Sequence, residues 1–227
     1  MTHEYELTTL MKIMHGALSA EALQVQEVVG NLSEGESLQS FTIRFNQWAS
    51  VLMYHADVED EYMTAPLTEF LAARTNEEEH SQLGELSDAL TQYLEDQNSN
   101  NLESKIKQVA VALHDEQHEQ LLEKLEDVLS VLNDEISKTS LVARTRRHLY
   151  GKIVALRICQ DDHLESEEYL VLPEIETNLD MEQKKTLVNR LLIDNDSDDP
   201  QWILDWMKTR STQKDADVLD GIVEAFR

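Results

Sequence analysis

Cysteine is almost absent from this chain. Its 227 residues include a single cysteine, Cys159, so the chain cannot form an internal disulfide or a zinc site of clustered thiolates. Residues that break regular structure are also scarce, with only 6 glycines and 3 prolines. A β-sandwich or β-barrel of this length would need many turns rich in such residues. The scarcity therefore favours a fold made of long helices.

Positive charge is also in short supply. Lys and Arg number 19 against 45 Asp and Glu, which gives a formal net charge of −26. Nucleic acids and anionic membrane surfaces are polyanions, so this balance argues against both as partners. No apolar run reaches the roughly 18 residues of a membrane-spanning helix, and the N-terminus shows no signal-peptide pattern. Since 41% of the residues are apolar, a core can form, and we expect a soluble, cytoplasmic protein.

Apolar residues recur at three- and four-residue spacing along most of the chain, which predicts amphipathic helices. The long helices are expected at residues 4–29, 37–65, 102–136 and 141–172. Shorter helices are expected at 77–94, 181–193, 200–208 and 214–226. Pro66 and Pro173 are expected to end the second and the last of the long helices, because proline breaks a helix interior.

The predicted architecture is all-α, an antiparallel four-helix bundle with two additions. Short turns join the long helices into two hairpins, which together form a bundle domain over residues 1–175. A further helix is inserted at about 67–101, where the polar tract 97–101 forms a linker. Residues 176–227 form a helical extension that docks on the bundle through Trp202, Trp206 and Met207.

Histidine is the residue type whose placement points to chemistry. Of the 8 histidines, five fall on the apolar stripes of the predicted long helices. Burying that many imidazoles without partners would cost on the order of a few kcal/mol each. A shared metal site removes this cost. The five are His15, His55, His114, His118 and His163.

Carboxylates accompany these histidines at helical spacing. Residues four apart lie on one face of a helix, about 5–6 Å apart between Cβ atoms, so such a pair can aim at one point. The pairs with this spacing are His55–Glu59, His163–Glu167 and His114–His118. Within each hairpin the candidates also differ by only about one helical turn of height, counted from the connecting turn. The positions expected to meet in one layer are His15, His55, His118 and His163.

This set of residues resembles the hemerythrin family, whose members hold a non-haem di-iron centre inside an antiparallel four-helix bundle. The similarity covers about residues 1–175 and is greatest in the segments Tyr54–Tyr62 and Asp162–Pro173, which carry the His-x-x-x-Glu pairs. It implies two iron ions with an oxo or hydroxo bridge, although imidazole and carboxylate ligands also suit Mn and Zn. Glu59 and Glu167 are the implied bridging carboxylates. The implied ligands are His15, His55, Glu59, His114, His118, His163 and Glu167.

The resemblance also implies a function. A hemerythrin-like centre would bind a small diatomic molecule, O₂ or NO, in sensing, iron handling or stress protection. The fourth helix carries His-x-x-x-Glu rather than the His-x-x-x-x-Asp of oxygen-carrying hemerythrins, which weakens oxygen carriage as the role. Two alternatives stay open, and with them the question of enzymatic activity. One is a redox enzyme, ferroxidase- or peroxidase-like, at the same metals, and the other is a metal-free helical interaction protein.

Some residue assignments also stay open. His80 stands about where a shorter family member would place its third-helix ligand, and so competes with His114 and His118. Glu168 would replace Glu167 if the fourth helix were rotated. Each metal-binding imidazole also needs a hydrogen-bond acceptor, such as a carboxylate, at its other ring nitrogen, because that contact fixes the tautomer. The carboxylates available by sequence are Asp57, Glu61 and Glu165.

Overall fold

The computed structural model describes residues 7–33, 36, 38–67, 117–131 and 143–225. Every regular element within these ranges is helical, which confirms the predicted all-α class for this part of the chain. None of these helices is both long and apolar enough to cross a lipid bilayer. Nearly all of the predicted insertion at 67–101 lies outside the described residues, as do His80 and His114.

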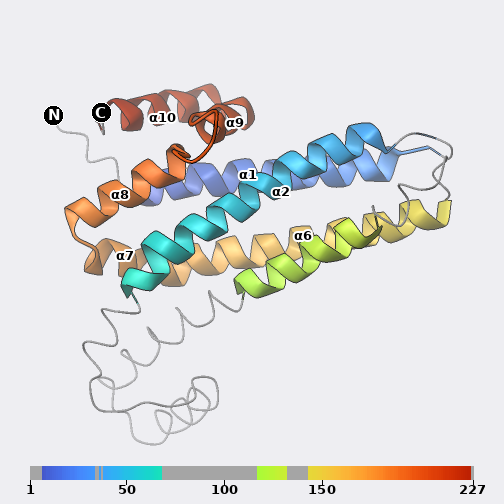
Figure 1. Cartoon of the computed structure of the whole chain (residues 1–227), viewed down its shortest axis with the longest axis horizontal. Coiled ribbons are helices and arrows are strands. Elements are labelled where there is room, and N and C mark those ends of the chain that lie inside the picture. Colours follow the sequence, from blue (N-terminus) through green and yellow to red (C-terminus); the bar gives the residue numbers. More distant parts are fainter. Residues whose placement is uncertain (1–6, 34–35, 37, 68–116, 132–142, 226–227) are drawn as a thin grey trace, which may run out of the picture.

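Four long helical stretches run along the longest axis of the molecule (Figure 1). They are α1 (Leu7–Asn31), α2 (Gln39–Glu59), the segment 117–131 and α6 (Ala143–Ser166). α1 packs against both α2 and α6 and is therefore their common neighbour. Each stretch coincides with one of the long helices expected from the sequence.

The core is built from the apolar stripes of these helices. On α2, Phe41, Phe45 and Trp48 are fully buried, with ring centroids 5.9 Å apart for the first two and 6.1 Å apart for the last two. Burying one such side chain stabilises the fold by roughly 1.5–3 kcal/mol. Other buried members of this core are Met11, Met14, Leu18, Leu121, Leu125, Val128, Leu149, Ile153 and Leu156.

Gln160 on α6 makes a polar contact inside this core. Its Oε1 atom accepts a hydrogen bond of 2.7 Å from the indole Nε1 of Trp48, and both side chains are fully buried. Replacing Gln160 with leucine leaves the indole N–H without this acceptor, so we expect the free energy of unfolding to fall by about 1–3 kcal/mol. Urea unfolding followed by circular dichroism measures the change. Gln47→Leu, at an exposed position of α2, is the control. Equal stability of the two variants would contradict the expectation.

Two π-helical turns interrupt the regular helices. η1 (Asp60–Thr64) directly follows α2, and η2 (Glu167–Val171) directly follows α6. The backbone N–H groups at their ends reach back five residues, from Ala65 to the carbonyl of Asp60 and from Leu172 to the carbonyl of Glu167. Such turns are rare, and they occur frequently at functional sites.

These π turns explain why the prediction for Pro173 is wrong and why the residue after Pro66 is still helical. Residues 65–67 are helical around Pro66, and α7 (Leu172–Asn178) carries Pro173 in its first turn. Proline is tolerated in the first turn of a helix because its missing N–H has no intrahelical partner there. The π turn lets a new helical stretch begin just before each proline, so the chain stays helical.

The C-terminal residues form three more helices. They are α8 (Met181–Leu192), α9 (Trp202–Arg210) and α10 (Gln213–Ala225). Their bounds lie within two residues of the predicted ones. α8 packs against α2 and α9 against α1, so this part of the chain lies along one side of the long helices (Figure 1). The division into a bundle domain and an extension at residue 175 stays a prediction.

A buried carboxylate links α9 to the long helices. Glu21 on α1 is fully buried, and its two oxygens accept hydrogen bonds from Nε of Arg44 on α2 at 2.7 Å and Nε of Arg210 on α9 at 2.6 Å. The Arg210 guanidinium also lies over the Trp206 ring, 4.6 Å from its centroid. Two cations from separate helices therefore face one buried anion.

Removing one of these cations is expected to destabilise the protein. Loss of one partner from a buried ion pair costs about 3–5 kcal/mol. Because Arg44 stays in place, we expect Arg210→Met to cost about half as much. Thermal or urea unfolding measures this, and Glu21→Gln provides a double-mutant cycle. If the Arg210 and Glu21 substitutions were simply additive, the coupling between the two residues would be disproved.

Candidate metal centre

The predicted imidazoles and carboxylates meet inside the layer of long helices. α1 contributes His15, α2 contributes His55 and Glu59, and α6 contributes His163. Their side chains are almost completely buried, with His15 the most exposed at 3%. Glu167, the first residue of η2, and His118, from the segment 117–131, complete the cluster and are also buried.

One group of potential ligands gathers around His15 and His55. Each member offers one ligand atom, and these atoms all lie within 4.8 Å of one another; the group is His15, His55, Glu59 and Glu167. Nε2 of His15 lies 3.1 Å from Oε2 of Glu167. Nε2 of His55 lies 2.8 Å from Oε1 of Glu59 and 4.0 Å from Oε2 of Glu167.

A second group shares Glu59 with the first. It consists of Glu59, His118 and His163, again within 4.8 Å of one another. Here the other oxygen of Glu59 is used, since its Oε2 lies 3.4 Å from Nε2 of His118 and 3.7 Å from Nε2 of His163. Glu59 therefore turns one oxygen toward each group, which is the arrangement of a carboxylate that bridges two cations.

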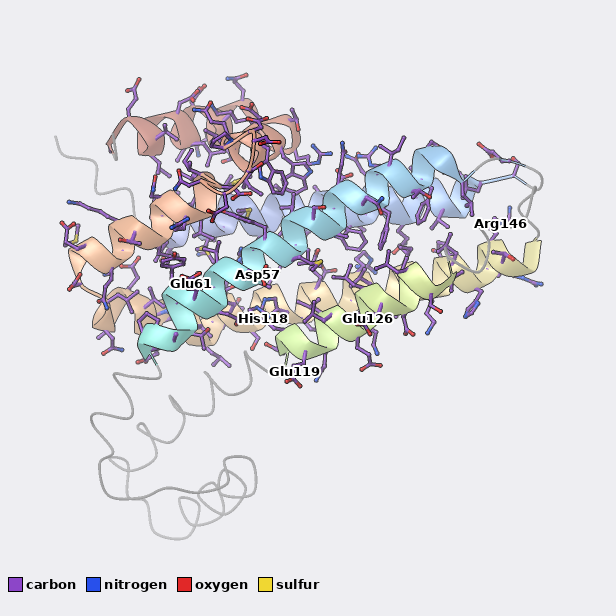
Figure 2. The ribbon with its side chains drawn as sticks, viewed as in Figure 1. Asp57, Glu61, His118, Glu119, Glu126 and Arg146 are labelled. Atoms are coloured by element: carbon purple, nitrogen blue, oxygen red, sulfur yellow. The ribbon has the colours of Figure 1, made fainter. Side chains whose placement is uncertain are left out.

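All four imidazoles present the same nitrogen to the cluster. In each ring Nε2 is the nitrogen that faces Glu59 or Glu167. Two rings are held at the opposite nitrogen, Nδ1 of His15 by Oε1 of Glu168 at 2.9 Å and Nδ1 of His118 by Oδ1 of Asp60 at 2.8 Å. Figure 2 shows His118 beside the continuous helical stretch of α2 and η1, in which Asp57 lies on α2 and Glu61 on η1.

The structure thus bears on two questions that the sequence left open. Glu168 does not replace Glu167, which is fully buried in the cluster, but contacts His15 from behind. The carboxylates that contact Nδ1 of His15 and His118 are Glu168 and Asp60. Neither is among the three carboxylates that were available by sequence for this role, Asp57, Glu61 and Glu165. A signal for the true pair was present in the sequence: each predicted glutamate ligand is directly followed by another acidic residue.

Opposing electrostatic effects act on the imidazoles. Burial disfavours the charged form of His15, but the nearby charge of Glu167 and the hydrogen bond to Glu168 outweigh it and raise its pKa to about 10. For His118, hydrogen bonds to Asp60 and Glu59 likewise outweigh burial, and its pKa also rises to about 10. Burial dominates for His55 and His163, whose pKa values are lowered.

The pKa values of the two buried glutamates are shifted in opposite directions. Burial raises the pKa of Glu167 to about 8, and the adjacent negative charge of Glu59 adds to the effect. For Glu59 itself, the surrounding imidazoles overcome the effect of burial and hold the pKa well below its usual range. Without cations in the gap, the cluster therefore keeps protons on His15, His118 and Glu167 at neutral pH.

The donor atoms of the cluster fit metal ions. Nε2 of His15, Nε2 of His55 and both oxygens of Glu167 are buried, and within the described part of the chain none makes a hydrogen bond of normal geometry. Burying a polar atom without a hydrogen bond costs free energy, and a buried carboxylate needs a compensating positive charge. Divalent cations between the two groups would satisfy both requirements.

Three kinds of comparison with known proteins found no match for this chain. No family model, curated protein or solved structure matches it. The geometry of the cluster is therefore the basis for any statement about metal binding.

Six of the seven ligands named from the sequence lie together in this cluster. They are His15, His55, Glu59, His118, His163 and Glu167. The seventh, His114, lies outside the described residues, as does its competitor His80. Neither residue can therefore be placed relative to the cluster. The arrangement as a whole offers imidazole and carboxylate ligands from four separate helical stretches, and could hold a pair of metal ions.

Proposed function

We propose that this protein is a hemerythrin-like di-metal protein that binds O₂ or NO, with α1, α2, the segment 117–131 and α6 forming its four-helix bundle. The observation that carries the proposal is the position of Glu59, shared between two groups of buried ligands. A single metal ion would not need a carboxylate turned in two directions. Sensing, iron handling and protection against oxidative or nitrosative stress are roles consistent with such a centre.

The surrounding residues prepare the site for small, uncharged ligands. Met11, Met14 and Leu18 flank His15 on α1, and Leu52 precedes His55 by three residues on α2; all four are buried. This apolar shell limits the access of water and of large or charged molecules. A ferrous pair, when bound, supplies the affinity for O₂ or NO that protein side chains lack.

Glu59 and Glu167 supply the negative charge that the site requires. Both are fully buried, so their charge acts in a medium that screens it weakly. The imidazoles add neutral nitrogen ligands at Nε2. Iron is the metal that the resemblance implies, while the donor set alone also suits Mn or Zn.

The decisive experiment is reconstitution of the protein with Fe²⁺ under anaerobic conditions, followed by metal analysis. We expect about two iron ions per chain, and fewer than one transition-metal ion would contradict the proposal. Absorption spectra recorded before and after the admission of O₂, and of NO in a parallel sample, then test the ligand. No spectral change with either gas would contradict the diatomic ligand while leaving the metal site in place.

The alternative functions give different results in the same experiment. Catalytic turnover with peroxide or Fe²⁺ that is lost in His55→Ala would favour a redox enzyme at the same metals. A metal-free interaction protein would be unaffected by chelators. The buried, unsatisfied donor atoms of His15, His55 and Glu167 argue against that last reading.

A further inference from the structure

We infer that Asp60 and Glu168 are paired positioning residues, which orient His118 and His15 so that Nε2 of each ring is the metal-binding atom. The inference rests on the proposed function, because it concerns how the same site is held. Neither residue belongs to either group of potential ligands.

Each imidazole lies between two consecutive residues of a single partner helix. His15 has Glu167 at Nε2, 3.1 Å away, and Glu168 at Nδ1, 2.9 Å away. His118 repeats the arrangement with the other helix, since Glu59 lies 3.4 Å from its Nε2 and Asp60 lies 2.8 Å from its Nδ1. The same construction thus occurs twice, at the ends of α2 and α6.

The backbone explains why consecutive residues can take these different roles. Successive side chains on a helix point about 100° apart, so one acidic residue can face the interior while the next reaches an imidazole on a neighbouring helix. The first pair, Glu59 and Asp60, spans the passage from α2 into η1, and the second pair, Glu167 and Glu168, opens η2 directly after α6.

Exposure separates the positioning residues from the ligands. The side chains of Asp60 and Glu168 are 52% and 29% exposed, whereas those of Glu59 and Glu167 are fully buried. Asp60 and Glu168 therefore stay in contact with solvent while each accepts a hydrogen bond from a buried ring.

The chemistry of imidazole gives these contacts their consequence. A neutral ring carries one proton, and whichever nitrogen bears it cannot bind a metal. When Nδ1–H donates to a carboxylate, the lone pair is on Nε2, and both the tautomer and the ring orientation are fixed. For His15 and His118, that lone pair faces the two glutamates of the cluster.

The test measures Zn²⁺ affinity by competition with a chromophoric chelator, because Zn²⁺ is diamagnetic and has no redox chemistry. Asp60→Asn and Glu168→Gln remove the charge of each positioning residue with little change of shape. We expect each substitution to weaken Zn²⁺ binding at one position by about 10- to 100-fold. Asp60→Glu and Glu168→Asp, which restore the carboxylate, are expected to recover part of the loss.

Glu61→Gln and Glu165→Gln are the matched controls. They remove the same charge at exposed positions close to Asp60 and Glu168, and are expected to leave Zn²⁺ affinity within about twofold of the wild type. Circular dichroism of the metal-free variants verifies folding. The two positions are tested separately, so a failure to fold at one leaves the other as the test.

A second readout reports the tautomer directly. In the Zn²⁺-loaded protein, ¹⁵N spectra of labelled histidine should show Nε2 bound to metal and Nδ1 protonated for His15 and His118, with the Nδ1–H protected from exchange. Asp60→Asn and Glu168→Gln should each reduce that protection at one ring only. Unchanged affinity and protection in both variants, or metal bound at Nδ1, would overturn the inference. A wild type that binds neither Zn²⁺ nor Fe²⁺ would overturn the proposed function as well.

Discussion

Glu59→Ala is expected to abolish metal binding at both positions, whereas Glu167→Ala should leave about one ion bound per chain. The reason is geometric, because Glu59 belongs to both groups of potential ligands and Glu167 belongs to one. Metal analysis after anaerobic reconstitution with Fe²⁺, repeated with Zn²⁺, distinguishes the two variants by stoichiometry.

Two further substitutions sharpen this comparison. His15→Ala removes a ligand of the first group only, and His118→Ala one of the second only, so each should behave like Glu167→Ala rather than like Glu59→Ala. Glu165→Gln, at an exposed position, should bind the full complement. If Glu59→Ala retained as much metal as Glu167→Ala, Glu59 would not be the shared ligand.

The stability of the metal-free protein is expected to fall as the pH rises from about 6.5 to 10. His15 and His118 have folded-state pKa values raised to about 10, and Glu167 has one raised to about 8. A group whose pKa is raised by folding stabilises the fold below its unfolded pKa, and that stabilisation is lost as the pH passes the folded value. All three groups therefore act in the same direction in this window.

His55 and His163 do not reverse this trend. Their pKa values are lowered by burial, so their influence on stability falls below pH 6.5. Thermal unfolding of chelator-treated protein at pH 6.5, 8 and 9.5 would measure the effect. We expect a fall in Tm of about 10 °C or more, since about 1 kcal/mol corresponds to about 2–4 °C in a chain of this size.

The metal-loaded protein is expected to behave differently. Cations require neutral imidazoles and ionised carboxylates, so they replace the protons that these groups would otherwise hold. Its Tm should therefore stay nearly constant over the alkaline window and should exceed that of the metal-free protein most clearly at pH 9.5. Equal pH profiles with and without metal would contradict the placement of cations in the cluster.

The clustering of these side chains could be predicted from the sequence because helical periodicity determines which side chains share a face. His55 and Glu59 are four residues apart, so any α-helix would place them together. The proximity of His15 and Glu167 is a tertiary contact. It was anticipated because, within each hairpin, the candidate histidines lie at similar numbers of residues from the connecting turn. Burial of every described member then followed from the apolar stripes around them.

The residues behind the imidazoles could not be predicted in the same way. The contact of Asp60 with His118 depends on the local rotation where α2 passes into η1, and periodicity carries no information about that rotation. The continuation of the helix past Pro173 was missed for a related reason. Whether a π turn forms, with its backbone hydrogen bond between residues five apart, depends on tertiary packing. Proline, by contrast, indicates a helix end from the local sequence alone.

Each π turn contains one residue more than a regular α-helical turn, and the wider turn absorbs that residue, so the helix that follows keeps the phase of an unbroken helix one residue shorter. Deleting a single residue from Asp60–Thr64 or from Glu167–Val171 would therefore allow an uninterrupted α-helix without rotating the downstream residues. A residue inserted into a helix that stays α-helical would instead rotate everything after it by about 100°. Leu67 in the first case and Ile175 in the second, both buried, would then turn away from the apolar interior.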